Sequence, residues 1–372
     1  MRNSDIKFSI LLGLSVTIFL IVLFFGLRTK GFDSLNGATW LEDEPGIRFG
    51  NYGIAYGLID NDQVKQGISG LNAFSIEIAV RPESFYQKGF NLILCLHDGK
   101  DNNQLIVGQY ESYIIAMNGD DYSHRRKTKR IYADILSKKP EKVLLTVTTG
   151  HEGTRLYADG RLIEARSDLV LKIPQGDRLK LTLGNSVYGK GSWKGDLYGL
   201  ALYGDELEQE TITNHFKAWS ENQVLSFSGN DKPLLAFTFN EGKGAEITDT
   251  VAGIQKLSIP SRFTIPERQY ISLPWRDFKA DKRYLMDFII NLAGFIPLGF
   301  VICALFIQSG GIFQKKAVLF SVIFCFLTSL CIEIAQAWIP SRSSQGLDLV
   351  LNTIGAWIGA MLTRWEDGRR GR

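Results

Sequence analysis

The hydropathy pattern divides this chain into membrane-like segments and a long central part of ordinary polarity. Apolar runs occupy residues 8–27 and most of residues 285–363. A run of about 20 apolar residues is long enough to cross the hydrocarbon core of a bilayer as a helix. Residues 34–260 instead contain short runs in which apolar and polar side chains alternate, as in half-buried β-strands. The pattern therefore predicts a helical membrane part and a separate β-domain.

We expect four membrane spans, at Phe8–Leu27, Leu285–Ile307, Ala317–Ile339 and Leu347–Leu362. The first is followed by no small-residue cleavage site and is interpreted as an uncleaved signal anchor within residues 1–30, with a cleaved signal peptide as the alternative. Lysines and arginines accumulate at the N-terminus, in residues 308–316 and in the basic tail 364–372. The positive-inside rule places these segments in the cytoplasm, so both termini are expected inside and residues 28–284 outside.

The central part carries the signals of an antiparallel β-domain. Phe74–Pro82 places an apolar side chain at every second position, and Asp159-Gly160 is a typical two-residue hairpin turn between two further runs. One helical patch is expected at Asp205–Trp219. The predicted fold class is therefore α+β and multidomain, with an all-β jelly-roll sandwich and a four-span α-helical membrane domain.

Three motifs in the β-domain resemble laminin G-like domains of the concanavalin A-like jelly-roll group. They are Phe74-Ser-Ile-Glu-Ile-Ala-Val-Arg-Pro82, Arg155-Leu-Tyr-Ala-Asp-Gly-Arg161, and Leu183-Gly-Asn185 together with Lys194-Gly-Asp-Leu-Tyr198. The resemblance implies binding of glycans or proteins and, in some members, of calcium at an edge of the sandwich. Residues 234–259 look like a strand pair that such domains usually place at their start, which leaves the boundary open. We assign 34–260 to the domain and 261–284 to a linker.

The apolar C-terminal segments carry polar residues at helical spacing. Asp348, Asn352, Gly355 and Gly359 follow i, i+4, i+7 and i+11, so they share one helix face. An ionisable group inside a bilayer costs a few kcal/mol, so such groups usually face a bundle interior and mark function. We expect one polar cluster near the outer interface, consisting of Asn291, Glu333, Gln336, Arg342, Asp348 and Asn352.

Two interpretations of this polar cluster remain open. Polar side chains also join membrane helices by hydrogen bonds, and Gly355-x-x-x-Gly359 is a close-packing motif. In that structural interpretation Glu333 simply pairs with Arg342. In the functional interpretation the cluster binds a ligand or carries a reaction, and Arg342 pairs with a carboxylate or holds an anionic headgroup through its planar fork.

The same residues resemble the VanZ-like family of bacterial membrane proteins. The matching pieces are Asn291-Leu-Ala-Gly-Phe-Ile-Pro-Leu-Gly299, Glu333-x-x-Gln336, Arg342, Asp348-x-x-x-Asn352 and Gly355-x-x-x-Gly359. With the first span they cover residues 8–27 and about 281–363, so the β-domain looks inserted between the first and second spans, and 285–363 forms a membrane domain of three helices. The resemblance implies a bacterial cytoplasmic-membrane protein that acts near the cell envelope. Some members are associated with glycopeptide resistance, but the resemblance does not imply that role or any catalytic mechanism.

Composition narrows the chemistry further. The net charge of +3 gives no bulk electrostatic argument for nucleic-acid binding. Neither the four histidines nor the four cysteines have metal-ligand spacing, so no metal site or cofactor is predicted. Two further hypotheses concern the β-domain: a calcium site, and binding of anionic lipid headgroups or acidic polysaccharide by the basic run Arg125–Arg130, for which a solvated loop is the competing interpretation. The calcium candidates are Asp98, Asp101, Asn102, Asp120 and Asp121.

Sugar binding would require exposed aromatic side chains, for which core packing is the competing interpretation. The candidates are Tyr110, Tyr113, Tyr122, Tyr188 and Trp193. Glycoside hydrolysis would require two carboxylates that face a cleft, and no strand carries a Glu-x-Asp-x-x-Glu-like pattern.

The expected function is recognition of an envelope glycan or polymer by the exported jelly roll, coupled to a VanZ-like membrane core. One alternative is a membrane enzyme or transporter that acts on a lipid-linked envelope intermediate through Glu333, Arg342 and Asp348. Another is a membrane-anchored scaffold that recruits a protein partner. The expected partners are the phospholipid bilayer and a free or lipid-linked glycan, in the bacterial inner membrane.

Overall fold

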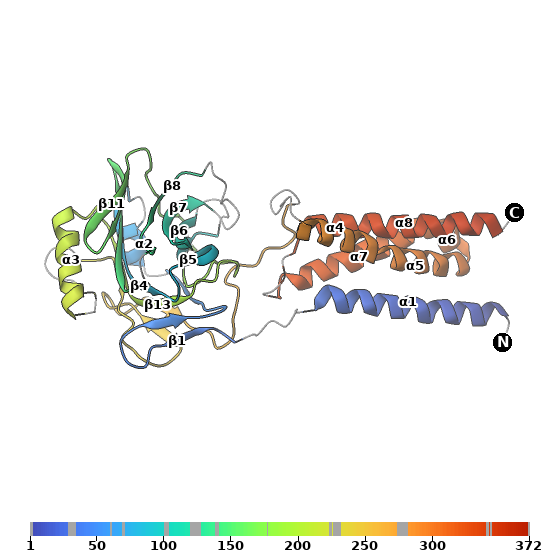
Figure 1. Cartoon of the computed structure of the whole chain (residues 1–372). Coiled ribbons are helices and arrows are strands. Elements are labelled where there is room, and N and C mark those ends of the chain that lie inside the picture. The colour runs from blue at the N-terminus through green and yellow to red at the C-terminus, as the bar shows by residue number, and fades with distance from the viewer. Residues whose placement is uncertain are drawn as a thin grey trace. The chain divides into compact units, whose positions relative to one another are not determined.

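The computed structural model describes most of the chain in two compact units. The described residues are 3–28, 35–59, 62–68, 71–99, 104–119, 128–137, 141–176, 178–222, 225, 232–273, 282–339, 342 and 344–370. One unit is the sandwich, Ser34–Glu267, and the other is the membrane unit, Met1–Asp33 together with Arg268–Arg372 (Figure 1).

The sandwich consists of two eight-stranded antiparallel sheets. The first sheet contains, in spatial order, β1 (Ala38–Trp40), β2 (Ile47–Phe49), β13 (Gly195–Tyr203), β4 (Phe74–Pro82), β9 (Val143–Gly150), β10 (Gly153–Ala158) and β11 (Arg161–Arg166), with β14 (Leu235–Phe237) beside β13. The second contains β15 (Glu246–Thr248), β16 (Lys256–Ser258), β3 (Ala55–Leu58), β12 (Lys180–Leu183), β5 (Gln87–His97), β6 (Gln104–Glu111), β7 (Tyr113–Gly119) and β8 (Arg130–Asp134). Two helices accompany them, α2 (Asp62–Ile68) and α3 (Gln209–Asn222). The predicted fold class is confirmed.

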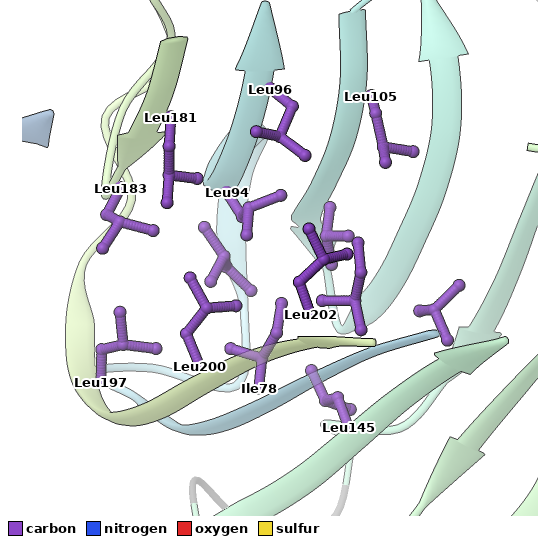
Figure 2. Packing of buried hydrophobic residues seen from close by; sticks show 14 of the residues in the cluster. Ile78, Leu94, Leu96, Leu105, Leu145, Leu181, Leu183, Leu197, Leu200 and Leu202 are labelled. Atoms are coloured by element: carbon purple, nitrogen blue, oxygen red, sulfur yellow. The ribbon is translucent and has the colours of Figure 1, made fainter. Parts of the chain in front are cut away.

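The main core of the sandwich lies between the two sheets. Figure 2 shows side chains such as Ile78 and Leu200 from the first sheet facing Leu94 and Leu181 from the second. Each of these four side chains is at most 3% exposed. Full burial of one such side chain stabilises the fold by about 1.5–3 kcal/mol. The alternating positions of β4 lie in this core, as their pattern predicts.

The other face of β4 is also buried, which alternation alone does not predict. Helix α3 contributes Ile212 and Trp219 to a second apolar cluster on this face of the first sheet. Beneath it, the Glu77 carboxylate accepts a hydrogen bond of 2.8 Å from the Tyr203 hydroxyl and lies 3.0 Å from His215 Nδ1. Glu77 is therefore a partnered polar residue of the fold.

The late strands complete the sandwich. β14 pairs with β13, and the β15–β16 hairpin joins the second sheet through β3. The unit continues to Glu267, which accepts a hydrogen bond of 2.6 Å from Lys180 Nζ, and Phe263 is only 4% exposed. Residues 261–267, expected in the linker, thus pack on the sandwich, because they bury the Phe263 ring and provide a hydrogen-bond acceptor for Lys180.

We expect residues 34–267 to fold without the membrane helices, because the sandwich has its own core. Circular dichroism should show a β-rich spectrum and one cooperative unfolding transition. A fragment of residues 34–233 is the control and should lose that transition, since it lacks β14, β15 and β16. Cooperative unfolding of the shorter fragment at the same temperature would contradict this account of the late strands.

Among the described residues of the membrane unit, every secondary-structure element longer than an isolated bridge is a helix. Its elements are α1 (Asn3–Leu27), α4 (Lys282–Gly294), α5 (Ile296–Gln308), α6 (Gly311–Lys315), α7 (Ala317–Gln336) and α8 (Gly346–Arg370). Among the described residues, four stretches are long and apolar enough to cross a membrane: Ile6–Leu27, Leu285–Gln308, Ala317–Gln336 and Gly346–Arg369. They overlap the four predicted spans, although the third ends at Gln336 and the fourth continues to Arg369.

Two details of these helices differ from the sequence expectation. The second stretch is divided at Phe295, because Pro297 in the first turn of α5 favours a helix start and cannot donate the backbone bond that would continue α4. Helix α8 continues to Arg370, so residues 364–370, expected as a basic tail, are helical.

Candidate functional site

The membrane unit contains a cavity of about 510 Å³ among α1, α4, α7, α8 and the connection that precedes α8. We call it the membrane cavity. Its lining includes all six residues of the predicted polar cluster: Asn291, Glu333, Gln336, Arg342, Asp348 and Asn352. It also includes Arg28 at the end of the first span, Asp287 and Gln345. The polar residues of separate helices therefore share one space.

Glu333 is buried at the end of α7, where it is 1% exposed. Its Oε2 accepts a hydrogen bond of 2.7 Å from the backbone N–H of Gln345, immediately before α8. The first N–H groups of a helix lack intrahelical partners, and a negative charge is favourable there. Glu333 therefore holds the start of α8 as well as lining the cavity.

Arg342 is bound to the end of α1. Its Nε donates to Arg28 O at 3.1 Å and its Nη2 donates to Phe25 O at 2.9 Å. The last carbonyl groups of a helix are unpaired and attract a cation. The described hydrogen bonds of Arg342 thus go to backbone carbonyls, and they use two of its five N–H donors.

Two amide side chains complete the inner lining. Gln336 Nε2 donates to Gly26 O at 2.8 Å, which joins α7 to α1. Asn352 is 4% exposed, and its Nδ2 donates to Ser329 Oγ at 2.9 Å. Its Oδ1 is buried and has no partner in the described part of the chain. Leaving a buried acceptor unpaired costs about 1–3 kcal/mol, so this oxygen suits a donor brought by a ligand or water.

Glycines let α8 approach α4 and α5 closely beside the cavity. A Cβ atom at Gly355 would overlap with Leu292 O, and one at Gly359 would overlap with Ile296 O. On α5, a Cβ at Gly299 would likewise overlap with Ala356 O. Only residues without a side chain fit at such crossings of two backbones.

In the sandwich, the predicted aromatic candidates divide into buried and exposed groups. Trp193 is 0% and Tyr188 is 6% exposed, so both are packing residues, whereas Tyr110 is 43% and Tyr113 36% exposed. Tyr122 lies outside the described residues. Tyr110 and Tyr113 are direct cross-strand partners on β6 and β7, and the Tyr113 ring lies 6.0 Å from that of Tyr132 on β8. We call Tyr110, Tyr113 and Tyr132 the tyrosine strip.

The calcium hypothesis stays a prediction. Of its candidates, Asp98 is described and buried, and the other four, Asp101, Asn102, Asp120 and Asp121, lie outside the described residues. Among the residues that are described, no group of three His, Cys, Asp or Glu side chains is placed to hold a metal ion.

The basic run is described only at Thr128, Lys129 and Arg130. Lys129 Nζ donates to Asp168 O at 2.9 Å. The neighbouring Arg166 guanidinium hydrogen-bonds the Asp168 carboxylate and lowers its pKa to about 2. This end of the run therefore faces a local anionic partner.

Comparison with known proteins locates two families in the chain. Residues 235–366 match the VanZ/LLP1 family, from β14 into α8. Residues 59–213 match a family described as the concanavalin A-like lectin/glucanases superfamily. Comparison with curated protein sequences gave no match.

Comparison with solved structures matched the binding domain of botulinum neurotoxin DC in complex with SialylT. That domain is 16% identical with a TM-score of 0.37, over 52% of this chain and 48% of that chain. The receptor-binding domain of a botulinum neurotoxin C/D mosaic serotype is 15% identical with a TM-score of 0.37, over 50% of this chain and 47% of that chain. This chain therefore spans about half the length of each.

Sequence motifs, fold and family matches agree on the two parts of this molecule. The last three of the four apolar stretches and the polar cluster lie almost entirely in the part that matches the VanZ/LLP1 family. The first stretch, Ile6–Leu27, lies outside it. The chain therefore joins a concanavalin A-like jelly-roll domain of the laminin G type to a VanZ-like membrane segment.

Proposed function

We propose that this protein binds the polar headgroup of a membrane lipid, or of a lipid-linked envelope intermediate, in the membrane cavity. The observation that carries the proposal is the cavity itself. Charged and amide side chains line about 510 Å³ of space between helices apolar enough to cross a bilayer. Polar groups are costly in such helices, and cavities of roughly 300–1,000 Å³ are the size that small ligands occupy.

A purely structural role accounts for only part of this lining. It explains the hydrogen bonds that Glu333, Gln336 and Arg342 make with neighbouring backbone. It does not explain the unpaired Asn352 Oδ1 at the cavity wall. We therefore propose a binding role for the cavity.

Filling the membrane cavity should block this binding. Gly294 lines the cavity, and a Cβ atom there would meet nothing within 4 Å, so Gly294→Trp should occupy the space without disturbing the helices. In lipid nanodiscs, labelling by a phospholipid with a photoreactive headgroup should fall about tenfold, as expected when roughly 1.4 kcal/mol of binding is lost. Gly13→Trp in α1 is the matched control, since its surroundings are equally open and it lies outside the cavity. Equal labelling of both variants would sink the proposal.

We further propose that the tyrosine strip of the sandwich binds an envelope glycan. Its three rings are 36–50% exposed on neighbouring strands. Aromatic rings offer flat apolar faces to the C–H groups of a sugar, and tyrosine hydroxyls add hydrogen bonds.

Tyr113→Ala should weaken retention of the full-length protein on envelope polysaccharide about fivefold, because one ring contact contributes about 1 kcal/mol. Ile163→Ala on β11 is the control, since Ile163 is also exposed, at 45%, but lies on the other sheet. Failure of the polysaccharide to retain the wild type and the control would contradict glycan binding by the tyrosine strip. A membrane-anchored scaffold that recruits a protein partner would then be the better hypothesis.

We propose a bacterial inner-membrane topology in which residues 28–284 are external and both termini are cytoplasmic. The support is the basic character of residues 308–316 and of the C-terminal segment, combined with four candidate spans. Alkaline phosphatase fused after Glu267 should be active, and the same enzyme fused after Arg372 should be inactive. The opposite pattern of activities would refute this topology.

A further inference from the structure

The membrane cavity carries side chains of both charges. Its lining includes the carboxylates of Asp287, Glu333 and Asp348 and the guanidinium groups of Arg28 and Arg342. A purely anionic ligand would meet three carboxylates, and a purely cationic ligand would meet two guanidinium groups. Like charges brought together in a site of low dielectric are unfavourable. A ligand with one group of each sign fits the lining better than either.

The positive side of the cavity lies at the end of α1. Arg342 donates to both Phe25 O and Arg28 O. Its guanidinium is therefore held beside the backbone of Arg28, the other arginine of the lining. Arginine donors in a fixed fork suit the oxygens of a phosphate. The remaining N–H donors of Arg342 therefore provide a phosphate position at this end.

The negative side lies on α7 and α8. The hydrogen bond from Asn352 to Ser329 places these two residues at the same height along α8 and α7. Glu333 follows Ser329 by four residues on α7, and Asp348 precedes Asn352 by four on α8. Because residues four apart are neighbours on a helix face, both carboxylates lie one turn from that bond.

Asn352 and Glu333 present hydrogen-bond acceptors on this side of the cavity. In the described part of the chain Asn352 Oδ1 is buried without a hydrogen-bond partner, and the Glu333 carboxylate accepts hydrogen bonds from the Gln345 N–H and the Ser344 hydroxyl. A carboxylate has about four lone-pair positions, so Glu333 retains capacity to accept. A primary ammonium, with three N–H donors and a positive charge, satisfies these acceptors together.

We propose that the membrane cavity recognises a phosphate joined through a short linker to a primary amine, as in a phosphoethanolamine headgroup. The ammonium contacts Glu333, Asp348 and Asn352 Oδ1, and the phosphate contacts Arg342 and Arg28. Ile21 and Ile290 also line the cavity and are 49% and 58% exposed, which gives acyl chains an apolar path at the side of the helices. This inference rests on the proposed function of the cavity as a headgroup site.

The test measures competition against the photoreactive phospholipid with full-length protein in nanodiscs. The competitors are phosphatidylethanolamine, phosphatidylglycerol, phosphatidylcholine and soluble phosphoethanolamine. Phosphatidylethanolamine should compete about tenfold better than phosphatidylglycerol, which has no amine, and better than phosphatidylcholine, whose ammonium has no N–H donors. Soluble phosphoethanolamine should compete more weakly than the lipid, and equal competition would overturn the lipid as the source.

Substitutions test which residues contact the ammonium and which contact the phosphate of the ligand. Glu333→Gln, and independently Asp348→Asn, should reduce the preference for phosphatidylethanolamine over phosphatidylglycerol to about onefold to threefold. Arg342→Lys should weaken both lipids alike, because lysine keeps the charge and loses the fork. The thermal unfolding midpoint of each variant serves as the check on folding.

The outcomes separate this inference from the function on which it rests. A wild-type preference for phosphatidylglycerol, or a preference unchanged in both carboxylate variants, overturns amine recognition and leaves headgroup binding intact. If no phospholipid competes and Gly294→Trp has no effect on labelling, both the inference and the proposed function fail.

Discussion

Replacing Gly359 with leucine is expected to prevent the membrane unit from folding. A Cβ atom at this position would overlap with Ile296 O and would lie 2.8 Å from Phe300 N, so the obstacle is the backbone of α5. Overpacking of side chains costs about 1–3 kcal/mol, and a backbone that cannot move aside costs more. The protein should therefore lose its cooperative thermal transition in detergent and become sensitive to protease within α8.

Gly368→Leu is the matched control, because Gly368 lies on the same helix and a Cβ there would meet nothing within 4 Å. Its unfolding midpoint should remain within a few degrees of the wild type. A Gly359→Leu protein that unfolds at the wild-type temperature would show that α8 and α5 do not cross at this position.

Arg342→Gln is expected to release the end of α1 from the rest of the membrane unit. It removes the two hydrogen bonds that the guanidinium donates to Phe25 O and Arg28 O. Amide hydrogen exchange in the last two turns of α1 should accelerate about tenfold or more, with little change in α5. Arg364→Gln is the control, since Arg364 makes a surface pair with Asp367 at 3.6 Å.

A double variant tests whether Glu333 and Arg342 form an ion pair. If Glu333 and Arg342 formed an ion pair, neutralising both would be milder than neutralising one, because a single unpaired buried charge is the costly state. The structure instead gives the two residues different backbone partners. The double variant Glu333→Gln/Arg342→Gln should therefore be no more stable than Arg342→Gln alone, and a restored unfolding midpoint would show that the pair exists.

The sandwich illustrates how far local pattern determines structure. Alternation in Phe74–Pro82 was sufficient to predict a strand and its core-facing side. The burial of Glu77 on the other side was not predictable, because it depends on α3, which lies more than 130 residues later in the sequence. The role of Tyr132 was missed for a similar reason, since only pairing with β7 places it beside Tyr113.

The membrane cavity shows the same division. Helical spacing indicated polar residues that share a helix face, and the six residues proposed for the polar cluster line the cavity. The partners of these residues were not predictable. Arg342 contacts the end of α1, and Arg28 lines the cavity. Both follow from the packing of α1 against the other helices, which leaves no periodic signal in the sequence.

The most direct test of the account is an experimental structure of the full-length protein in lipid nanodiscs, at a resolution that shows headgroups. We expect headgroup density in the membrane cavity, between the Arg342 guanidinium and the Glu333 carboxylate, with a hydrogen-bond donor against Asn352 Oδ1. In the Gly294→Trp protein the indole ring should occupy that space. A wild-type cavity that holds only water, or that is closed by direct pairing of Glu333 with Arg342, would contradict it.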